Sequence, residues 1–381
     1  MHRLYAGIAT LLLAAAPAFA FIPTAPTLEN KAYLVVDFDS GKVLAESNAN
    51  ARVAPASLTK MMTSYLVEQA LATGRMKETD PVFVSEYAWC RGTSKESCMY
   101  LPLNSQASVI DMLRGVIIQS GNDASKALAE HMAGNEPAFA ELMNKEAARL
   151  GMKGSHFVNA TGLPDPNHYT TAYDMAILAR AIVRDSAHYY PIYSEKEFTF
   201  NNIKQGNRNA LLFTDPTVDG LKTGHTEEAG YCLVASSKRG NMRLISVVMG
   251  TNSMQARADQ TRALFSWGFA NFESAVLQTA GGVLATPKVW FGKGDLVKAG
   301  LATDLAVTLP RGQRDKVTTE LVVDQEVDAP IAKGQELGKV NAMLDGKIIA
   351  SQPLVAMEPV EEASFFVRIW HSIMRFFSNL F

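Results

Sequence analysis

Strand patterns on both sides of a long helical region most constrain the fold of this 381-residue chain. Residues 31–47, KAYLVVDFDSGKVLAES, read as two strands joined by a tight Asp-Ser-Gly turn. Helical patterns then occupy much of residues 58–186, and alternating apolar segments return at residues 230–239 and 241–250. The sequence therefore predicts one sheet assembled from the two ends of a domain, with helices between them.

A second domain is indicated by a change of composition after the pattern TRALFSWGFANF. Residues from about 275 to 358 are rich in Val, Thr, Lys and Gly and contain short alternating runs. The pair Asp345-Gly346 between VNAML and KIIAS is a strong hairpin signal. We expect a small all-β domain here, following an α+β domain.

The first twenty residues have the three parts of a secretory signal. Arg3 supplies the positive charge, residues 11–16 the apolar stretch, and Ala18-Phe19-Ala20 the small-x-small cleavage site. A membrane-spanning anchor is the alternative, but the apolar run is too short for it. The pattern predicts export, with a mature chain beginning near Phe21.

The last segment, residues 363–381, predicts a strongly amphipathic helix. Its apolar side carries Phe366, Ile369, Trp370, Ile373, Phe377 and Leu380. Its polar side carries Arg368, His371, Ser372, Arg375, Ser378 and Asn379. A whole polar side favours a helix lying in a membrane interface over a spanning one. The other interpretation is a helix that docks on the protein's own core.

Charge and cysteine content narrow the functional classes. The formal net charge of -2 lacks the basic excess typical of nucleic-acid binders, and neither a phosphate-binding loop nor a His-Glu-x-x-His zinc motif occurs. Cys90 and Cys98 could close the polar loop CRGTSKESC in an oxidising compartment, although spacing alone leaves that pairing open. Cys232 reads as a small buried hydrophobe.

Three short motifs, each occurring once, carry the candidate chemistry. They are Ser57-Leu58-Thr59-Lys60, Ser120-Gly121-Asn122 and Lys222-Thr223-Gly224, in that order. Apolar residues surround Lys60, which argues against an ordinary solvated lysine.

A serine hydroxyl is a poor nucleophile until a base takes its proton, and a residue three positions further along a helix faces the same side. Lys60 can be that base for Ser57 only if its pKa falls far below the usual value. Burial and a second cation, which we expect to be Lys222, would both lower it.

With these motifs the chain resembles the penicillin-binding proteins and serine β-lactamases. The segments LKTGHTEEAGYCLVASSKR, SGNDAS and TGL resemble the low-molecular-mass D-alanyl-D-alanine carboxypeptidases of bacterial envelopes. The resemblance implies a catalytic domain with an antiparallel sheet flanked by helices. The expected division is a signal peptide at 1–20, the catalytic domain at 21–274, the β domain at 275–359 and an anchoring helix at 360–381.

The resemblance also implies roles for individual residues. Ser57 is the acyl-ester nucleophile, Lys60 the base and Ser120 a proton relay. The Asn122 amide suits a substrate peptide bond. The backbone N–H groups of Ser57 and His225 would form the oxyanion hole.

Substrate binding is assigned by the same resemblance to the third motif and its surroundings. Lys222, Thr223 and Gly224 would lie on an edge strand against which the substrate pairs, with Gly224 allowing close approach of the ligand backbone. Thr226 and Arg257, aided by Lys222, would hold the terminal carboxylate. The resemblance implies no cofactor and no metal.

The implied activity is removal of the terminal D-alanine from peptidoglycan pentapeptide stems, with β-lactam antibiotics acylating the same serine. We expect this to occur at the periplasmic face of the inner membrane, with residues 362–381 holding the membrane surface. A β-lactamase is disfavoured because no Glu-x-x-Leu-Asn-like segment lies between the second and third motifs. An endopeptidase or transpeptidase, and a non-catalytic penicillin sensor, remain alternatives.

Overall fold

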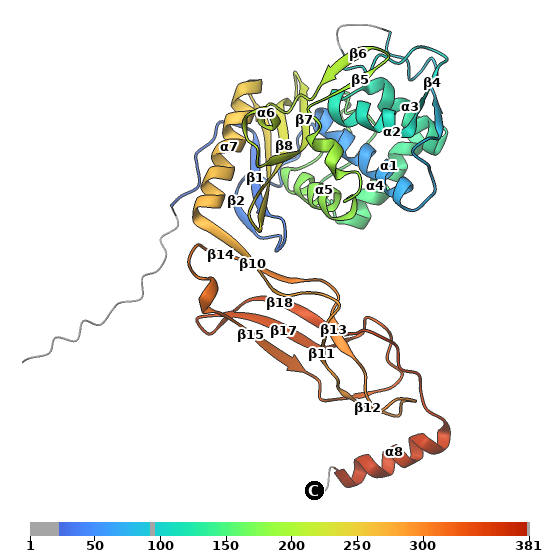
Figure 1. The fold of residues 1–381 in the computed structure, drawn as a ribbon, viewed down its shortest axis with the longest axis vertical. Coiled ribbons are helices and arrows are strands. Elements are labelled where there is room, and N and C mark those ends of the chain that lie inside the picture. Colours follow the sequence, from blue (N-terminus) through green and yellow to red (C-terminus); the bar gives the residue numbers. More distant parts are fainter. Residues whose placement is uncertain (1–22, 92–95, 379–381) are drawn as a thin grey trace, which may run out of the picture.

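The computed structural model describes residues 23–91 and 96–378. The chain forms a mixed α/β lobe, a β domain and a terminal helix, arranged one after another along the long axis of the molecule (Figure 1). The expected signal segment lies outside the described residues.

One five-stranded antiparallel sheet forms the centre of the first domain, in the order β2-β1-β9-β8-β7. Strand β1 pairs with β9 in a register that sets Leu34 opposite Val247. The predicted union of the two ends of the domain in one sheet is therefore confirmed, and β7 is an edge strand. The strands are β1 (Ala32–Asp37), β2 (Val43–Ser47), β7 (Val218–Thr226), β8 (Gly230–Arg239) and β9 (Met242–Thr251).

Helices cover both faces of this sheet because side chains of successive strand residues point to opposite faces. Val35 packs with α7, whereas Leu34 and Val36 belong to the larger core shared with α1 and α5. The helices are η1 (Ala56–Thr59), α1 (Lys60–Ala72), α2 (Val109–Arg114), η2 (Gly115–Gln119), α3 (Asn122–Ala133), α4 (Glu136–Leu150), α5 (Ala172–Asp185), η3 (Tyr190–Ser194), α6 (Leu211–Thr214) and α7 (Met254–Asn271). Two small hairpins complete the domain: β3 (Pro81–Phe83) with β4 (Gln106–Ser108), and β5 (Glu197–Phe200) with β6 (Ile203–Gly206).

The second domain is built of strands, as predicted, around its own apolar core. The expected hairpin at Asp345-Gly346 joins β17 to β18, and both turn residues have positive φ, as a type I′ turn requires. The elements are β10 (Phe272–Gln278), β11 (Val283–Ala285), β12 (Lys288–Trp290), β13 (Ala299–Leu301), β14 (Leu305–Pro310), η4 (Arg314–Lys316), β15 (Val317–Val323), β16 (Glu326–Asp328), β17 (Glu336–Leu344) and β18 (Lys347–Ala356).

Polar contacts join the two domains. Asp37, at the end of β1, is fully buried and accepts hydrogen bonds from Ser40 and from Ser274 on β10. Lys42 Nζ donates to the carbonyl oxygen of Thr308 on β14 at 3.1 Å. The hairpin β1-β2 of the first domain therefore rests on the first strand pair of the second.

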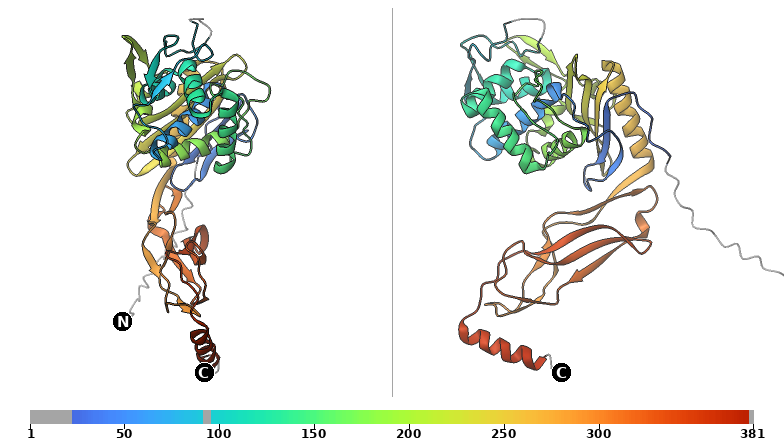
Figure 2. Two further views of the ribbon diagram at one scale, coloured as in Figure 1. Left: turned by 90° about the vertical axis from the view of Figure 1, so that its right-hand side faces the viewer. Right: turned by 180° about the vertical axis from the view of Figure 1, so that it is seen from behind.

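The terminal helix α8 (Phe365–Ser378) lies at the far end of the β domain from the first domain (Figures 1 and 2). Its polar side contacts that domain: His371 Nδ1 accepts a hydrogen bond from the backbone N–H of Phe291 at 2.8 Å, and Arg375 pairs with Asp328. Phe366 and Trp370 on the apolar side are exposed. None of the described helices is both long and apolar enough to cross a membrane.

Candidate active site

Ser57 and Lys60 meet where η1 passes into α1. Lys60 Nζ lies 3.2 Å from Ser57 Oγ, as their spacing in a helical turn predicts. Ser57 is half-buried and lines a cleft, whereas Lys60 is 1 % exposed. The pair therefore combines an accessible hydroxyl with an amine removed from water.

The Lys60 amine is held by three oxygen atoms from separate segments. Besides Ser57 Oγ, it donates to Asn122 Oδ1 and to the Thr161 carbonyl oxygen, each at 2.7 Å. Burial is the main cause that lowers the pKa of Lys60 to about 7, and the Arg208 guanidinium is the next. At neutral pH a large fraction of these amines is therefore uncharged.

Arg208 is a cation that the sequence analysis missed. We expected Lys222 to lower the pKa of Lys60, but the leading cationic contribution comes from Arg208. Lys222 is itself buried, and burial followed by the charge of Lys60 holds its own pKa well below the usual value. The cleft thus brings together several basic side chains, and their burial and mutual repulsion lower the pKa of each lysine.

The second motif forms the wall beside Lys60. Ser120 follows the π-helical turn η2 in a left-handed conformation, with φ 66°. Its buried hydroxyl has no hydrogen-bond partner within the described part of the chain. A free hydroxyl at this position is available to a bound ligand.

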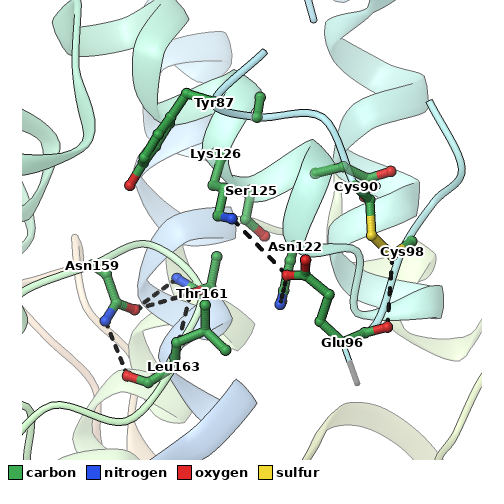
Figure 3. A network of polar contacts seen from close by, with 12 residues as sticks. Tyr87, Cys90, Glu96, Cys98, Asn122, Ser125, Lys126, Asn159, Thr161 and Leu163 are labelled. Atoms are coloured by element: carbon green, nitrogen blue, oxygen red, sulfur yellow. Dashed lines mark hydrogen bonds and ion pairs between the residues drawn. A yellow bond between two sulfur atoms is a disulfide. The ribbon is translucent and has the colours of Figure 1, made fainter. Parts of the chain in front are cut away.

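The Asn122 side chain is hydrogen-bonded through both its oxygen and its nitrogen. Its Oδ1 accepts from Lys60, and its Nδ2 donates to Glu96 Oε2 at 2.9 Å (Figure 3). The amide therefore links the Lys60 amine to the Glu96 carboxylate, and its expected role toward a substrate peptide bond stays a prediction. Glu96 was not among the residues selected from the sequence.

The third motif lies on the edge strand β7. Lys222 Nζ donates to the Thr223 carbonyl oxygen at 3.1 Å, and the His225 ring stacks on Tyr231 with 4.0 Å between centroids. A Cβ on Gly224 would lie 3.1 Å from the Pro55 carbonyl oxygen and 3.3 Å from Leu58. Close packing of β7 on the Ser57 turn therefore favours glycine here, and the expected close approach of a ligand backbone stays a prediction.

Arg257, at the start of α7, is 6 % exposed and reaches toward β7. It donates to the carbonyl oxygens of Gly224 at 3.2 Å and Cys232 at 3.5 Å, and no carboxylate pairs with it among residues 23–91 and 96–378. Thr226 Oγ1 accepts from the backbone N–H of Ala229. A guanidinium buried without an acidic partner is suited to bind an anion.

A cleft of about 770 Å³ collects these groups. Its lining includes residues of all three motifs, namely Ser57, Ser120, Asn122, Thr223 and Gly224, together with Glu96, Arg208, His225, Thr226 and Arg257. Within the described residues, no group of three or more His, Cys, Asp or Glu side chains could hold a metal ion.

The backbone around the nucleophile is tightly constrained. Ala56, directly before Ser57, has φ 47°, which is unusual for a residue with a side chain. Gly162 lies against it at φ 84°, and a Cβ on Gly162 would be 1.8 Å from the Ala56 carbonyl oxygen. The loop that supplies Thr161 can therefore approach the Ser57 turn only with glycine at position 162.

A disulfide between Cys90 and Cys98, with 6.1 Å between Cα atoms, decides the pairing that the sequence left open. Ser97, inside the closed loop, donates from Oγ to the Gln119 carbonyl oxygen at 2.8 Å, and its own carbonyl accepts from Asn122 N at 2.7 Å. The loop is thereby fastened to the second motif.

The chain is similar to known proteins along nearly its whole length. Residues 19–253 match the family described as D-alanyl-D-alanine carboxypeptidase, and residues 272–362 match the C-terminal domain of penicillin-binding protein 5. The carboxypeptidase DacA of Haemophilus influenzae is 47% identical over 94% of this chain and 92% of its own, and that of Escherichia coli K12 is 43% identical over 94% and 91%.

Solved structures agree with this similarity. Penicillin-binding protein 5 from H. influenzae matches with a TM-score of 0.82 and 48% identity, over 89% of this chain and all of that one. Penicillin-binding protein D2 from Listeria monocytogenes, solved in a cefotaxime-bound form, matches with a TM-score of 0.60 and 29% identity, over 65% of this chain and 100% of that one.

Gly162→Ala should destabilise the first domain strongly. The new Cβ would overlap the Ala56 carbonyl, so we expect a loss of more than about 3 kcal/mol in the free energy of unfolding, measured by urea denaturation. Gly134→Ala is the matched control: its φ is 81°, but no atom lies within 4 Å of the added Cβ. It should cost only about 1 kcal/mol. Equal losses would contradict the packing explanation.

Proposed function

The chain belongs to the D-alanyl-D-alanine carboxypeptidase family of serine peptidases, and we propose that it removes the terminal D-alanine from peptidoglycan stem peptides through an acyl-enzyme on Ser57. The observation that carries this proposal is the contact between Ser57 Oγ and the buried Lys60 amine. An uncharged amine 3.2 Å from a hydroxyl can accept its proton as the oxygen attacks.

In the acylation step, Ser57 Oγ forms a bond to the carbonyl carbon of the penultimate D-alanine while its proton passes to Lys60. The backbone N–H groups of Ser57 and His225 stabilise the negative charge on the carbonyl oxygen. Ser120 transfers a proton from Lys60 to the leaving nitrogen, the C–N bond breaks, and D-alanine departs. The free, buried hydroxyl of Ser120 supports this role. Water then hydrolyses the ester.

Substrate recognition uses the edge strand and the buried arginine. The free edge of β7 can pair with an extended peptide, as peptide ligands do with exposed strands elsewhere. Arg257, which lacks an acidic partner in the described residues, and Thr226 bind the terminal carboxylate, and the Lys222 amine lies on the same strand as Thr226. β-Lactams acylate the same serine, and a relative has been solved with cefotaxime bound.

We further propose that the enzyme works at the periplasmic face of the inner membrane, held there by α8. Support comes from the apolar side of this helix, on which Phe366 and Trp370 are exposed. The polar side contacts the β domain through His371 and Arg375. The β domain thus separates the cleft from the proposed membrane surface.

Ser57→Ala should abolish both release of D-alanine from a diacetyl-Lys-D-Ala-D-Ala peptide and covalent labelling by a fluorescent penicillin. The reason is that the variant has no atom at which the ester can form. Mass spectrometry of the adduct on the unaltered protein should place it on Ser57. A labelled Ser57→Ala protein would overturn the assignment.

The rate of penicillin acylation should rise with pH through a midpoint of about 7, because only the uncharged form of Lys60 accepts the serine proton. Stopped-flow acylation between about pH 5 and about pH 9 measures this profile.

Lys60→Ala is the control for that profile. It should slow acylation by about 10²–10⁴-fold and remove the rise at this midpoint. A profile that is flat in the unaltered protein, or that persists in Lys60→Ala, would contradict the role of Lys60.

Removing residues 362–381 should release the protein from phospholipid vesicles, because the exposed apolar side is lost, without lowering activity on a soluble peptide. The double variant Phe366→Gln and Trp370→Gln should weaken vesicle co-sedimentation in the full chain, whereas Ser372→Gln on the polar side should not. Full binding by the truncated protein would refute the anchor.

A further inference from the structure

We propose that Glu96 forms an acidic subsite that recognises a free ammonium group on the stem residue preceding the two D-alanines. This inference rests on the proposed function, because it concerns the substrate of the same cleft. It makes Glu96 a specificity-determining residue, and the ligand chemistry is a primary ammonium on a flexible side chain.

The position of Glu96 is the first support. Its carboxylate lines the cleft with a side chain that is 22% exposed. Oε2 accepts from Asn122 Nδ2 at 2.9 Å and lies 3.9 Å from Lys126 Nζ (Figure 3). Oε1 accepts no hydrogen bond from any described residue, so one oxygen of a charged group is left for a ligand.

The expected direction of the substrate is the second support. With the terminal carboxylate at Arg257 and the attacked carbonyl at Ser57, the rest of the stem must continue away from Arg257. Glu96 Oε2 accepts from the Asn122 amide that also binds Lys60, whereas Arg257 donates to the carbonyl oxygens of Gly224 on β7 and Cys232 on β8. Glu96 therefore belongs to the Lys60 part of the cleft, where the preceding residue would lie.

Reach is the third consideration. Lys60 Nζ contacts both Ser57 Oγ and Asn122 Oδ1, and the Asn122 amide contacts Glu96. The Glu96 carboxylate is therefore separated from the nucleophile by one ammonium group and one side-chain amide. The residue before the penultimate D-alanine has its Cα about 3.8 Å further along the peptide, and a lysine-like side chain extends several ångströms beyond it. An ammonium at its end can reach Oε1.

The subsite is also held in place before a ligand arrives. Ser97 is hydrogen-bonded to Gln119 and Asn122, and Cys98 is tied to Cys90. Glu96 directly precedes these anchored residues, so little conformational freedom is lost when it binds. Lys126 Nζ also lies 5.4 Å from the centre of the Tyr87 ring, so its charge has an interaction besides that with Glu96.

Two peptides that differ only at the side-chain amine test the inference. One is α-acetyl-Lys-D-Ala-D-Ala with a free ε-amine, and the other is the diacetylated form. The unaltered enzyme should show a kcat/KM about five- to tenfold higher for the free amine, as a charge-assisted hydrogen bond implies. Glu96→Gln should reduce this ratio to about one, because it removes the charge and keeps an acceptor for Asn122.

The ratio separates recognition from catalysis. Glu96→Gln also removes a charge that raises the pKa of Lys60, but that change affects both peptides alike. Glu227→Gln is the matched control: it neutralises the other carboxylate that lines the cleft and should keep the preference. Labelling by fluorescent penicillin reports that the cleft of each variant is intact.

Each outcome decides between the proposals. A ratio near one in the unaltered enzyme, or a preference that survives in Glu96→Gln, would overturn the subsite while D-alanine release still supports the carboxypeptidase. Equal loss on both peptides in Glu96→Gln would assign Glu96 to positioning Asn122 and would also overturn the subsite. Release from neither peptide by the unaltered enzyme would overturn the proposed function, and the subsite with it.

Discussion

The burial of one lysine amine is the constraint around which the first domain is organised. An amine removed from water needs hydrogen-bond acceptors, and Lys60 finds them in the Ser57 turn, at the start of α3 and in the loop before Gly162. These three segments are far apart in sequence, so the fold must bring them together before the amine is satisfied. The same burial lowers the proton affinity of Lys60, and structure and chemistry thus share one cause.

Close packing behind the nucleophile keeps this arrangement rigid. Ala56 has a positive φ, and Gly162 lies so close to its carbonyl oxygen that no side chain fits between them. Thr59, two residues after Ser57, is held by His168. Because Val158 N donates to His168 Nδ1, the proton of the neutral ring is on Nε2, which donates to Thr59 Oγ1 at 2.7 Å. Burial lowers the pKa of His168 to about 4, so this bond persists over the range in which Lys60 titrates.

Local patterns predicted what depends on local structure. The strand alternation predicted the union of β1 with β9, the Asp345-Gly346 pair predicted its hairpin, and the Ser-x-x-Lys spacing predicted the Ser57–Lys60 contact. Arg208 and Glu96 could not be found in this way, because both lie in loops without a motif. Arg208 affects Lys60 through its charge, and Glu96 accepts a hydrogen bond from Asn122. The tight packing around Gly224 could not be predicted either, since it depends on the distance between β7 and the Ser57 turn.

Two groups of the cleft that lack a partner within the described chain have a consequence for the whole molecule. Ser120 keeps a buried hydroxyl without a partner, and Arg257 keeps a buried charge without a counter-ion in the described chain. Both cost folding free energy, because a buried polar or charged group without a partner loses its hydration and gains nothing in exchange. A ligand that offers acceptors to Ser120 and Arg257 stabilises the folded state, so the protein with a bound ligand melts at a higher temperature than the protein without one.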